Sequence, residues 1–159
     1  MSIEITRNLE KAVVMALNFD DWQLEWTGDT NSLYDAEGLT PEKNGKRTRC
    51  VIEMKFRNKY YEKKLIEKSK YDELMALDDD IIKLYFVNDP RGNYLFWLNG
   101  INMPEPEIRD MRKTTLWNNG HQEKMIYLLP ENKASIVNVN QPERPQKSIW
   151  DEYFKKKKK

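Results

Sequence analysis

The chain has 159 residues, of which 33% are charged, and its mean hydropathy is −0.87. This length suits one domain with its own hydrophobic core. No run of 18 apolar residues is present, so neither a transmembrane helix nor a membrane partner is expected. The single cysteine, Cys50, leaves no internal disulfide. Residues 1–10 contain no apolar signal-peptide core, and a cytoplasmic-type compartment is therefore expected.

The net charge of +1 is unevenly distributed along the chain. Five lysines occupy residues 155–159, so the remaining residues together carry −4. Residues 41–70 contain eleven Lys or Arg and four Glu, a local net charge of +7. A basic region in an otherwise acidic chain fits a polyanionic partner such as nucleic acid. A solvated helix face of mixed charge would explain the same composition.

The first half of the chain predicts one helix followed by three strands. The helix spans 6–17, with Thr6 as N-cap and an apolar stripe at i, i+3, i+4, i+7 and i+8 made by Leu9, Ala12, Val13, Ala16 and Leu17. Alternation of Trp22, Leu24 and Trp26 predicts a half-buried strand. A short second strand is predicted at 32–38, and a third at 47–56 after a polar loop.

The second half predicts a helix at 60–77, then a strand at 81–87 that forms a hairpin with residues 93–98 through a turn at 89–92. Residues 104–110 are expected to form a loop, and 113–117, 124–129 and 134–139 short strands. The predicted organisation is a domain over 1–137, a polar linker over 138–147 and a basic tail over 148–159.

The third predicted strand contains two opposite charges in its centre. Because side chains alternate along a strand, Glu53 and Lys55 share one face with Val51. The opposite face, which comprises Cys50, Ile52, Met54 and Phe56, is apolar and should pack against helices. Buried charges are costly unless they are paired or bind a metal ion. A cross-strand salt bridge at the sheet surface is the simplest explanation of this pair.

A carboxylate in the preceding strand gives a second explanation. Asp35 lies within the predicted second strand, and a hairpin would bring it near Glu53. Two converging carboxylates need a cation, and hard oxygen ligands suit Mg²⁺. A neighbouring Lys55 would then orient or deprotonate a water molecule, or offset charge in a transition state.

This order of elements and residues resembles the PD-(D/E)xK nuclease superfamily over about residues 6–87. The resemblance implies an α/β fold with a restriction-endonuclease-like αβββαβ core, in which a central mixed sheet is flanked by helices. It implies that Asp35, Glu53 and the backbone carbonyl of Met54 bind Mg²⁺ or Mn²⁺, and that Lys55 assists the attacking water. Some members carry a further metal-binding Glu on the first helix, and Glu10 matches that position.

Candidate nucleic-acid contacts lie on the predicted helix and in the basic loop. The superfamily often has Gln and, four residues later, Tyr on the helix after the lysine strand, and Glu67 and Tyr71 have this spacing with Glu in place of Gln. Lysines on the same face are placed to hold phosphates. The complete set is Lys46, Arg47, Lys63, Glu67, Lys70 and Tyr71.

The C-terminal tail is similar to the short peptides by which replication and repair proteins dock on sliding clamps. Its anchors would be Ile149, Trp150, Tyr153 and Phe154. A disordered tail or a helix packed against the domain would explain the same residues. The five terminal lysines would attract nucleic acid in each case.

The expected function is metal-dependent hydrolysis of DNA, directed by branches, flaps or ends, in phage-type replication, recombination or repair. A phage-encoded protein would act in the host cytoplasm, and a homodimer is left open. The alternatives are a non-catalytic nucleic-acid-binding or replisome adaptor with a nuclease-like fold, and a structural domain whose Glu53–Lys55 pair is a surface ion pair.

Overall fold

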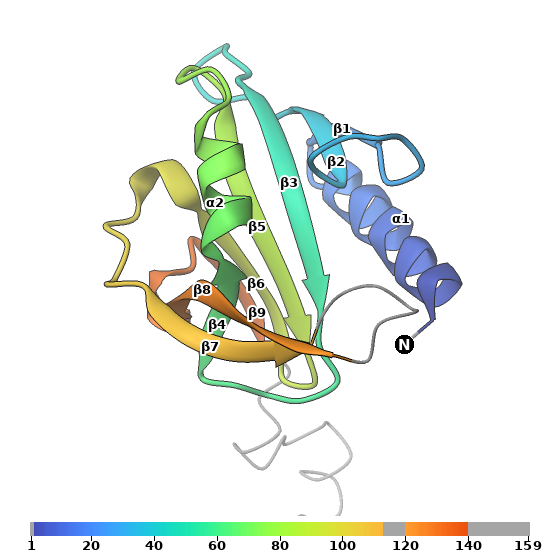
Figure 1. Ribbon diagram of the computed structural model, residues 1–159. Coiled ribbons are helices and arrows are strands. Elements are labelled where there is room, and N and C mark those ends of the chain that lie inside the picture. Colours follow the sequence, from blue (N-terminus) through green and yellow to red (C-terminus); the bar gives the residue numbers. More distant parts are fainter. Residues whose placement is uncertain (1, 113–119, 140–159) are drawn as a thin grey trace, which may run out of the picture.

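The computed structural model describes residues 2–112 and 120–139 (Figure 1). The predicted strand at 113–117, nearly all of the linker and the whole tail with its four anchors lie outside these residues. The elements are α1 Ile3–Phe19, β1 Gln23–Trp26, β2 Ala36–Leu39, β3 Arg49–Phe56, β4 Lys63–Glu67, α2 Lys68–Met75, β5 Ile82–Asp89, β6 Gly92–Trp97, η1 Leu98–Gly100, β7 Glu107–Arg112, β8 His121–Pro130, η2 Glu131–Lys133 and β9 Ile136–Val139.

A six-stranded sheet with the order β1-β2-β3-β5-β6-β9 forms the centre of the molecule. β3 and β5 are parallel and the other pairs are antiparallel, which confirms the predicted mixed sheet. A second, antiparallel sheet has the order β4-β8-β7. Strand β9 ends at Val139, two residues beyond the predicted domain limit of 137. Among the described residues, no helix is both long enough and apolar enough to cross a membrane.

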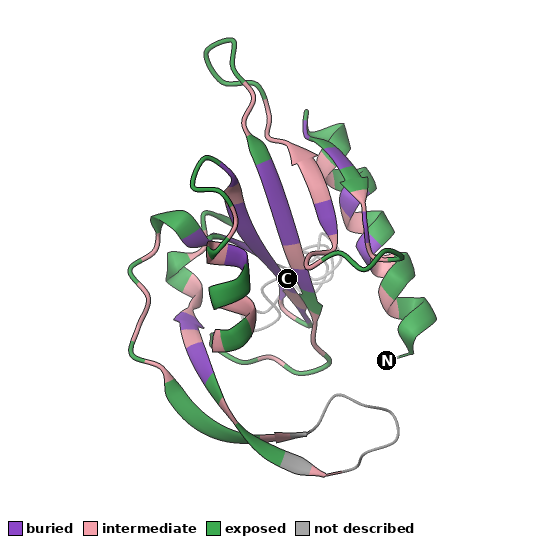
Figure 2. Cartoon of the chain, turned by 45° about the horizontal axis from the view of Figure 1, so that its top comes forward, coloured by how far each residue is buried: buried purple, intermediate pink, exposed green. Residues whose placement is uncertain are grey.

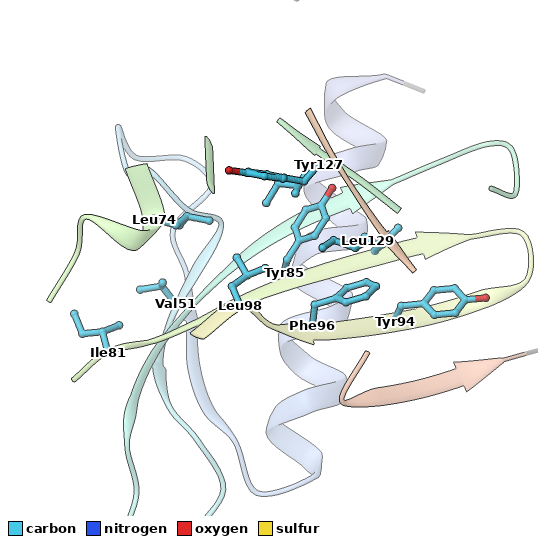
Figure 3. Packing of buried hydrophobic residues seen from close by; sticks show 11 residues of the cluster. Val51, Leu74, Ile81, Tyr85, Tyr94, Phe96, Leu98, Tyr127 and Leu129 are labelled. Carbon is cyan, nitrogen blue, oxygen red and sulfur yellow. The ribbon is translucent and has the colours of Figure 1, made fainter. Parts of the chain in front are cut away.

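The two faces of β3 bury different clusters, as predicted from the alternation of its residues. Cys50, Ile52 and Met54 pack with Val14 of α1 on one side of the central sheet. Val51 packs on the other side against α2 and the small sheet. Figure 3 shows this second cluster, in which Tyr85 and Phe96 lie beside Leu129. Glu53 and Lys55 therefore project on the side of the small sheet.

Helix α1 is longer than predicted and is rotated by about one residue. Its N-cap is Ser2, whose hydroxyl accepts the Ile5 N–H at 3.2 Å, so the predicted cap at Thr6 is wrong. Glu10 and Val14 are the buried residues of the helix, whereas Ala12 and Ala16 are exposed. A carboxylate on the buried side was outside the apolar pattern, and its burial depends on a partner from β1.

The predicted helix at 60–77 is a helix only in its second half. Residues 63–67 form β4, in which Lys64 and Ile66 are buried and the intervening residues are not (Figure 2). Pairing with β8 uses this alternation and overrides the helix propensity of Lys, Leu and Glu. The predicted loop at 104–110 is confirmed for residues 104–106 and wrong from Glu107 onward, where the chain pairs with β8 as β7.

Replacement of Gly38 by alanine is expected to destabilise the fold by about 1–3 kcal/mol. Gly38 pairs with Leu24, and a β-carbon there would lie 1.9 Å from the backbone oxygen of Gln23, so β1 and β2 would have to separate. Chemical denaturation measures the change. Gly100→Ala is the control, because its added carbon would meet only Trp97 at 3.9 Å. Equal stability of the two variants would contradict the prediction.

Candidate metal and DNA site

Asp35 is held at the point where β2 begins. Its N–H donates to the Ile52 carbonyl at 2.9 Å and its own carbonyl accepts the Thr27 N–H at 2.8 Å. The last paired residues are Ala36 and Ile52, so the next part of β3 has no strand beside it on this edge. The Asp35 carboxylate fills that position and accepts the Met54 N–H at 2.8 Å.

The backbone carbonyl of Met54 faces the same open edge. Within an extended strand the N–H and the C=O of one residue point to the same side. Since the Met54 N–H points to Asp35, its carbonyl points there too. The structure thus places the three predicted oxygen donors of Asp35, Met54 and Glu53 on adjoining parts of β2 and β3.

Glu53 is the most strongly perturbed carboxyl of the site. Its side chain is 17% exposed. Burial and the nearby Asp35 carboxylate raise the pKa of Glu53 to about 7, while Lys70 and Lys55 oppose this shift. Burial also raises the pKa of Asp35, against the Met54 N–H and the two lysines. Both carboxylates therefore lack part of the positive charge that would stabilise their ionised forms.

Lys70 supplies the nearest fixed positive charge from α2. Its Nζ lies 3.6 Å from Glu53 Oε2 and donates to the Leu33 carbonyl at 2.9 Å. This second contact fastens α2 to the segment that leads into Asp35. Lys55 is exposed, but loss of solvent around its amine and the neighbouring Arg57 lower its pKa, which the nearby carboxylates oppose.

Glu10 reaches the site from the other side of the central sheet. It is buried, and its Oε1 accepts the Trp26 Nε1–H at 2.9 Å. Burial and Asp35 raise the pKa of Glu10, whereas the Trp26 bond and Arg7 lower it. Glu10 is thus near enough to Asp35 for their charges to interact. Trp26 is the partner that the sequence did not identify.

The donor set fits Mg²⁺ or Mn²⁺ by its chemistry. Mg²⁺ takes one or two carboxylates, keeps several waters and contacts substrate phosphate, and Asp35, Glu53 and the Met54 carbonyl supply hard oxygens of this type. The mutual repulsion that raises the Glu53 pKa is what a cation would relieve. Among the described residues, no three His, Cys, Asp or Glu side chains gather closely enough to enclose a metal ion, so Glu10 does not complete a cage with the other two.

Removal of the Lys70 charge is expected to raise the pKa of Glu53 above about 7, because Lys70 is the strongest of the groups that lower it. The Lys70→Met variant keeps the aliphatic stem and loses the ammonium group. NMR titration of the Glu53 carboxyl carbon measures the pKa of Glu53 in the wild type and in the Lys70→Met variant. Lys68→Met is the matched control, since that lysine pairs with Asp72 at 2.6 Å on the same helix. A Glu53 midpoint that is unchanged in Lys70→Met would contradict the assigned contact.

The predicted nucleic-acid residues of the 60–77 segment do not share one helix face. Lys63 lies at the start of β4, and Lys70 alone reaches the carboxylates. Glu67 pairs with Lys124 of β8 at 2.9 Å. Tyr71 is half-buried and packs edge-on against Tyr127, with ring centroids 5.2 Å apart. Glu67 and Tyr71 therefore both contact side chains of β8 in the small sheet.

Lys46 and Arg47 lie at the opposite end of β3 from Glu53. Six residues of extended chain separate Arg47 from Glu53, roughly 20 Å. Arg47 is held by Asp21, with 2.7 Å between Nη2 and Oδ1, and it also donates to the Asp21 carbonyl. These two residues are thus not brought to the candidate site.

Arg57 is a site neighbour that the sequence analysis missed. Its N–H donates to the Asn88 carbonyl at 2.8 Å, so β3 continues beside β5 by one more residue. Arg57 therefore follows Glu53 and Lys55 on the same face. The same alternation that places Glu53 and Lys55 on one face would have identified Arg57 if it had been followed for two more residues.

Comparison with known proteins shows that this mixed α/β fold is similar to a solved structure. The structure is similar to that of Hjc from Archaeoglobus fulgidus, a Holliday junction resolvase from an archaeal hyperthermophile. The match has a TM-score of 0.51 and 11% sequence identity, and it covers 80% of this chain and 93% of that chain. No protein-family model matches the sequence, and no curated protein matches it significantly. The likeness confirms the predicted fold class.

Proposed function

We propose that this protein is a metal-dependent nuclease that hydrolyses phosphodiester bonds in DNA and is directed by branches, flaps or ends. The observation that carries the proposal is the proximity of the Asp35 and Glu53 carboxylates at the open edge of β3, where Lys55 and Lys70 also lie. The similarity of the fold to a Holliday junction resolvase supports DNA as the substrate. Roles in phage-type replication, recombination or repair belong to the same proposal.

Each residue has a distinct task in this proposal. Asp35, Glu53 and the Met54 carbonyl would hold Mg²⁺ or Mn²⁺, which would supply a lowered pKa for a water molecule and polarisation of the phosphate. Lys55, with its lowered pKa, would orient the attacking water and, as the neutral amine, accept its proton. Lys70, whose Nζ lies 3.6 Å from Glu53, would contact a phosphate oxygen of DNA bound beside the carboxylates. Glu10 fixes Trp26 through the indole N–H and adds negative charge near Asp35.

Cleavage of a panel of labelled DNA substrates tests the proposal. The full chain is mixed with linear duplex, single-stranded, flapped and four-way-junction DNA in Mg²⁺, in Mn²⁺ and in EDTA. Cleavage is expected with either metal and is expected to vanish in EDTA. Asp35→Asn and Lys55→Met should each lose activity, whereas Glu25→Gln, an exposed carboxylate on β1, should retain it. No cleavage with either metal would overturn the proposal.

A non-catalytic DNA-binding adaptor is the second candidate. It is favoured by the position of Lys70, whose ammonium group lies 3.6 Å from Glu53 and gives the acidic site a cation of its own. An adaptor would bind the DNA panel with equal affinity in Mg²⁺ and EDTA and would leave every substrate intact. It would also tolerate Asp35→Asn without loss of affinity.

A further inference from the structure

A cavity of about 240 Å³ lies between the β3–β4 connection and β7, separate from the carboxylates of the candidate site. We refer to it as the β3–β7 cavity. Its lining includes four basic residues, Arg57, Lys59, Lys63 and Arg109. It also includes apolar and aromatic residues, Tyr61, Leu65, Val87, Met111 and Leu128. The cavity therefore offers both cations and an apolar surface to a ligand.

The charges around the cavity do not cancel. Lys64 and Asp89 also line it, but their side chains are only 2% and 1% exposed and pair with each other at 2.7 Å. Asp110 is the other carboxylate in the lining. The four basic residues outnumber this single carboxylate, so the cavity favours an anionic ligand. The buried Lys64–Asp89 pair belongs to the lining but adds no net charge to it.

The β3–β7 cavity lies next to the candidate site along the same face of β3. Glu53, Lys55 and Arg57 follow one another at every second residue on one face of β3, and Arg57 then lines the cavity. Four residues of strand separate Glu53 from Arg57, roughly 13 Å. Each strand of B-DNA carries one phosphate per about 3.4 Å of helix axis. A DNA strand bound at Glu53 therefore reaches the cavity within a few nucleotides.

We infer that the β3–β7 cavity binds an unpaired nucleotide of the DNA strand that passes through the candidate site. The basic side chains contact its phosphate, and its base lies against Tyr61, which is 57% exposed. A bare phosphate would gain nothing from the apolar lining, and a base pair within a duplex is too large for this volume. The inference rests on the proposed function and deepens it, because it requires an unpaired nucleotide beside the cleaved bond.

Binding to single-stranded and duplex DNA without metal tests the inference. Fluorescence anisotropy of the full chain in EDTA compares a single-stranded oligonucleotide with a duplex of the same sequence. Tyr61→Ala is expected to bind the single strand about tenfold more weakly, because base–aromatic stacking is lost. Its affinity for the duplex should change less than twofold. Tyr61→Phe, which retains the ring, should match the wild type on both.

Arg109 provides a second, independent variant. Arg109→Ala is expected to weaken single-strand binding and to reduce the slope of log K against log salt by about one, whereas Arg109→Lys should retain the slope. Thermal unfolding checks that each variant is folded, as expected for exposed side chains. Wild-type affinity of Tyr61→Ala for the single strand, or equal loss on both DNAs, would overturn the inference.

The failure of this inference is separable from the failure of the proposed function. If Tyr61→Ala weakens single-strand binding in EDTA as predicted but the wild type cuts no substrate, the nucleotide site is supported and the nuclease function is not. A chain that cuts DNA with Mg²⁺ while Tyr61→Ala binds the single strand normally retains the assignment and loses the nucleotide site.

Discussion

Glu53→Gln is expected to reduce cleavage by at least about a thousandfold and, at the same time, to make the folded protein more stable above pH 7. The amide removes the charge that holds the metal and leaves the shape of the side chain unchanged. It also removes a carboxylate that burial and Asp35 make difficult to ionise, since the pKa of Glu53 is raised to about 7. Activity and stability should therefore change in opposite directions.

The pH dependence of stability fixes the sign of this effect. Because the folded state binds the Glu53 proton more tightly than the unfolded state, wild-type stability should fall as pH rises from about 4.5 to about 7 and should then level off. Glu53→Gln lacks this fall. Its advantage should be absent near pH 4 and reach about 3 kcal/mol at pH 8. Urea unfolding at the two pH values measures the difference.

The exposed Glu25→Gln serves as the control for this experiment and should differ from the wild type by less than about 0.5 kcal/mol at both pH values. If Glu53→Gln is destabilised at pH 8, the carboxylate is satisfied in the folded protein and the assigned electrostatics are wrong. If it cuts DNA as well as the wild type, Glu53 has no part in holding the metal.

Asp89→Asn is expected to destabilise the protein by about 3–5 kcal/mol, the largest change in stability that we predict. Asp89 accepts the Lys64 ammonium through Oδ2 at 2.7 Å and the Arg91 N–H through Oδ1 at 2.8 Å. Asparagine can keep the second bond but loses the charge. The ammonium of Lys64 would then stay buried between the rings of Tyr60 and Tyr94 without its main counter-ion. Chemical denaturation measures the loss.

The double variant Asp89→Asn, Lys64→Met separates charge from shape. Removing both charges should restore most of the lost stability, since a buried pair can often be replaced by apolar groups at little cost. The single and double variants should thus differ by several kcal/mol. A single variant within about 1 kcal/mol of the wild type would indicate that Glu131, 3.6 Å from Lys64, already balances the charge.

The two faces of β3 were predictable because a strand buried on both sides still alternates. Cys50, Ile52 and Met54 form an apolar face that was expected to pack against helices. The charges on the other face were expected to be paired or to bind a metal ion. Asp35 could be placed beside them because β2 and β3 are consecutive strands that pair as a hairpin. These are local relations, and local periodicity is where a single sequence is most informative.

The errors have a common physical cause in the small sheet. β4 pairs with β8, which lies more than fifty residues further along the chain. This pairing determines that Lys63–Glu67 forms a strand and not a helix. Propensity alone favoured a helix at residues 63–67. On its other edge β8 pairs with β7, the strand just before it in the chain, which makes residues 107–110 a strand instead of a loop. The β3–β7 cavity exists only because these segments meet, so Arg109 and Tyr61 could not have been joined from their positions in the chain.

The shortness of β2 has a consequence for how such a site can arise or be lost. The strand stops pairing at Ala36, and the Asp35 side chain takes over the next backbone donor of β3. A β2 that paired two residues further would satisfy Met54 by ordinary strand contacts and would displace the carboxylate. Strand length would thereby remove the site while every acidic residue was still present. Insertions and deletions between Gly28 and Asp35 should therefore be as damaging to this site as substitution of its acids.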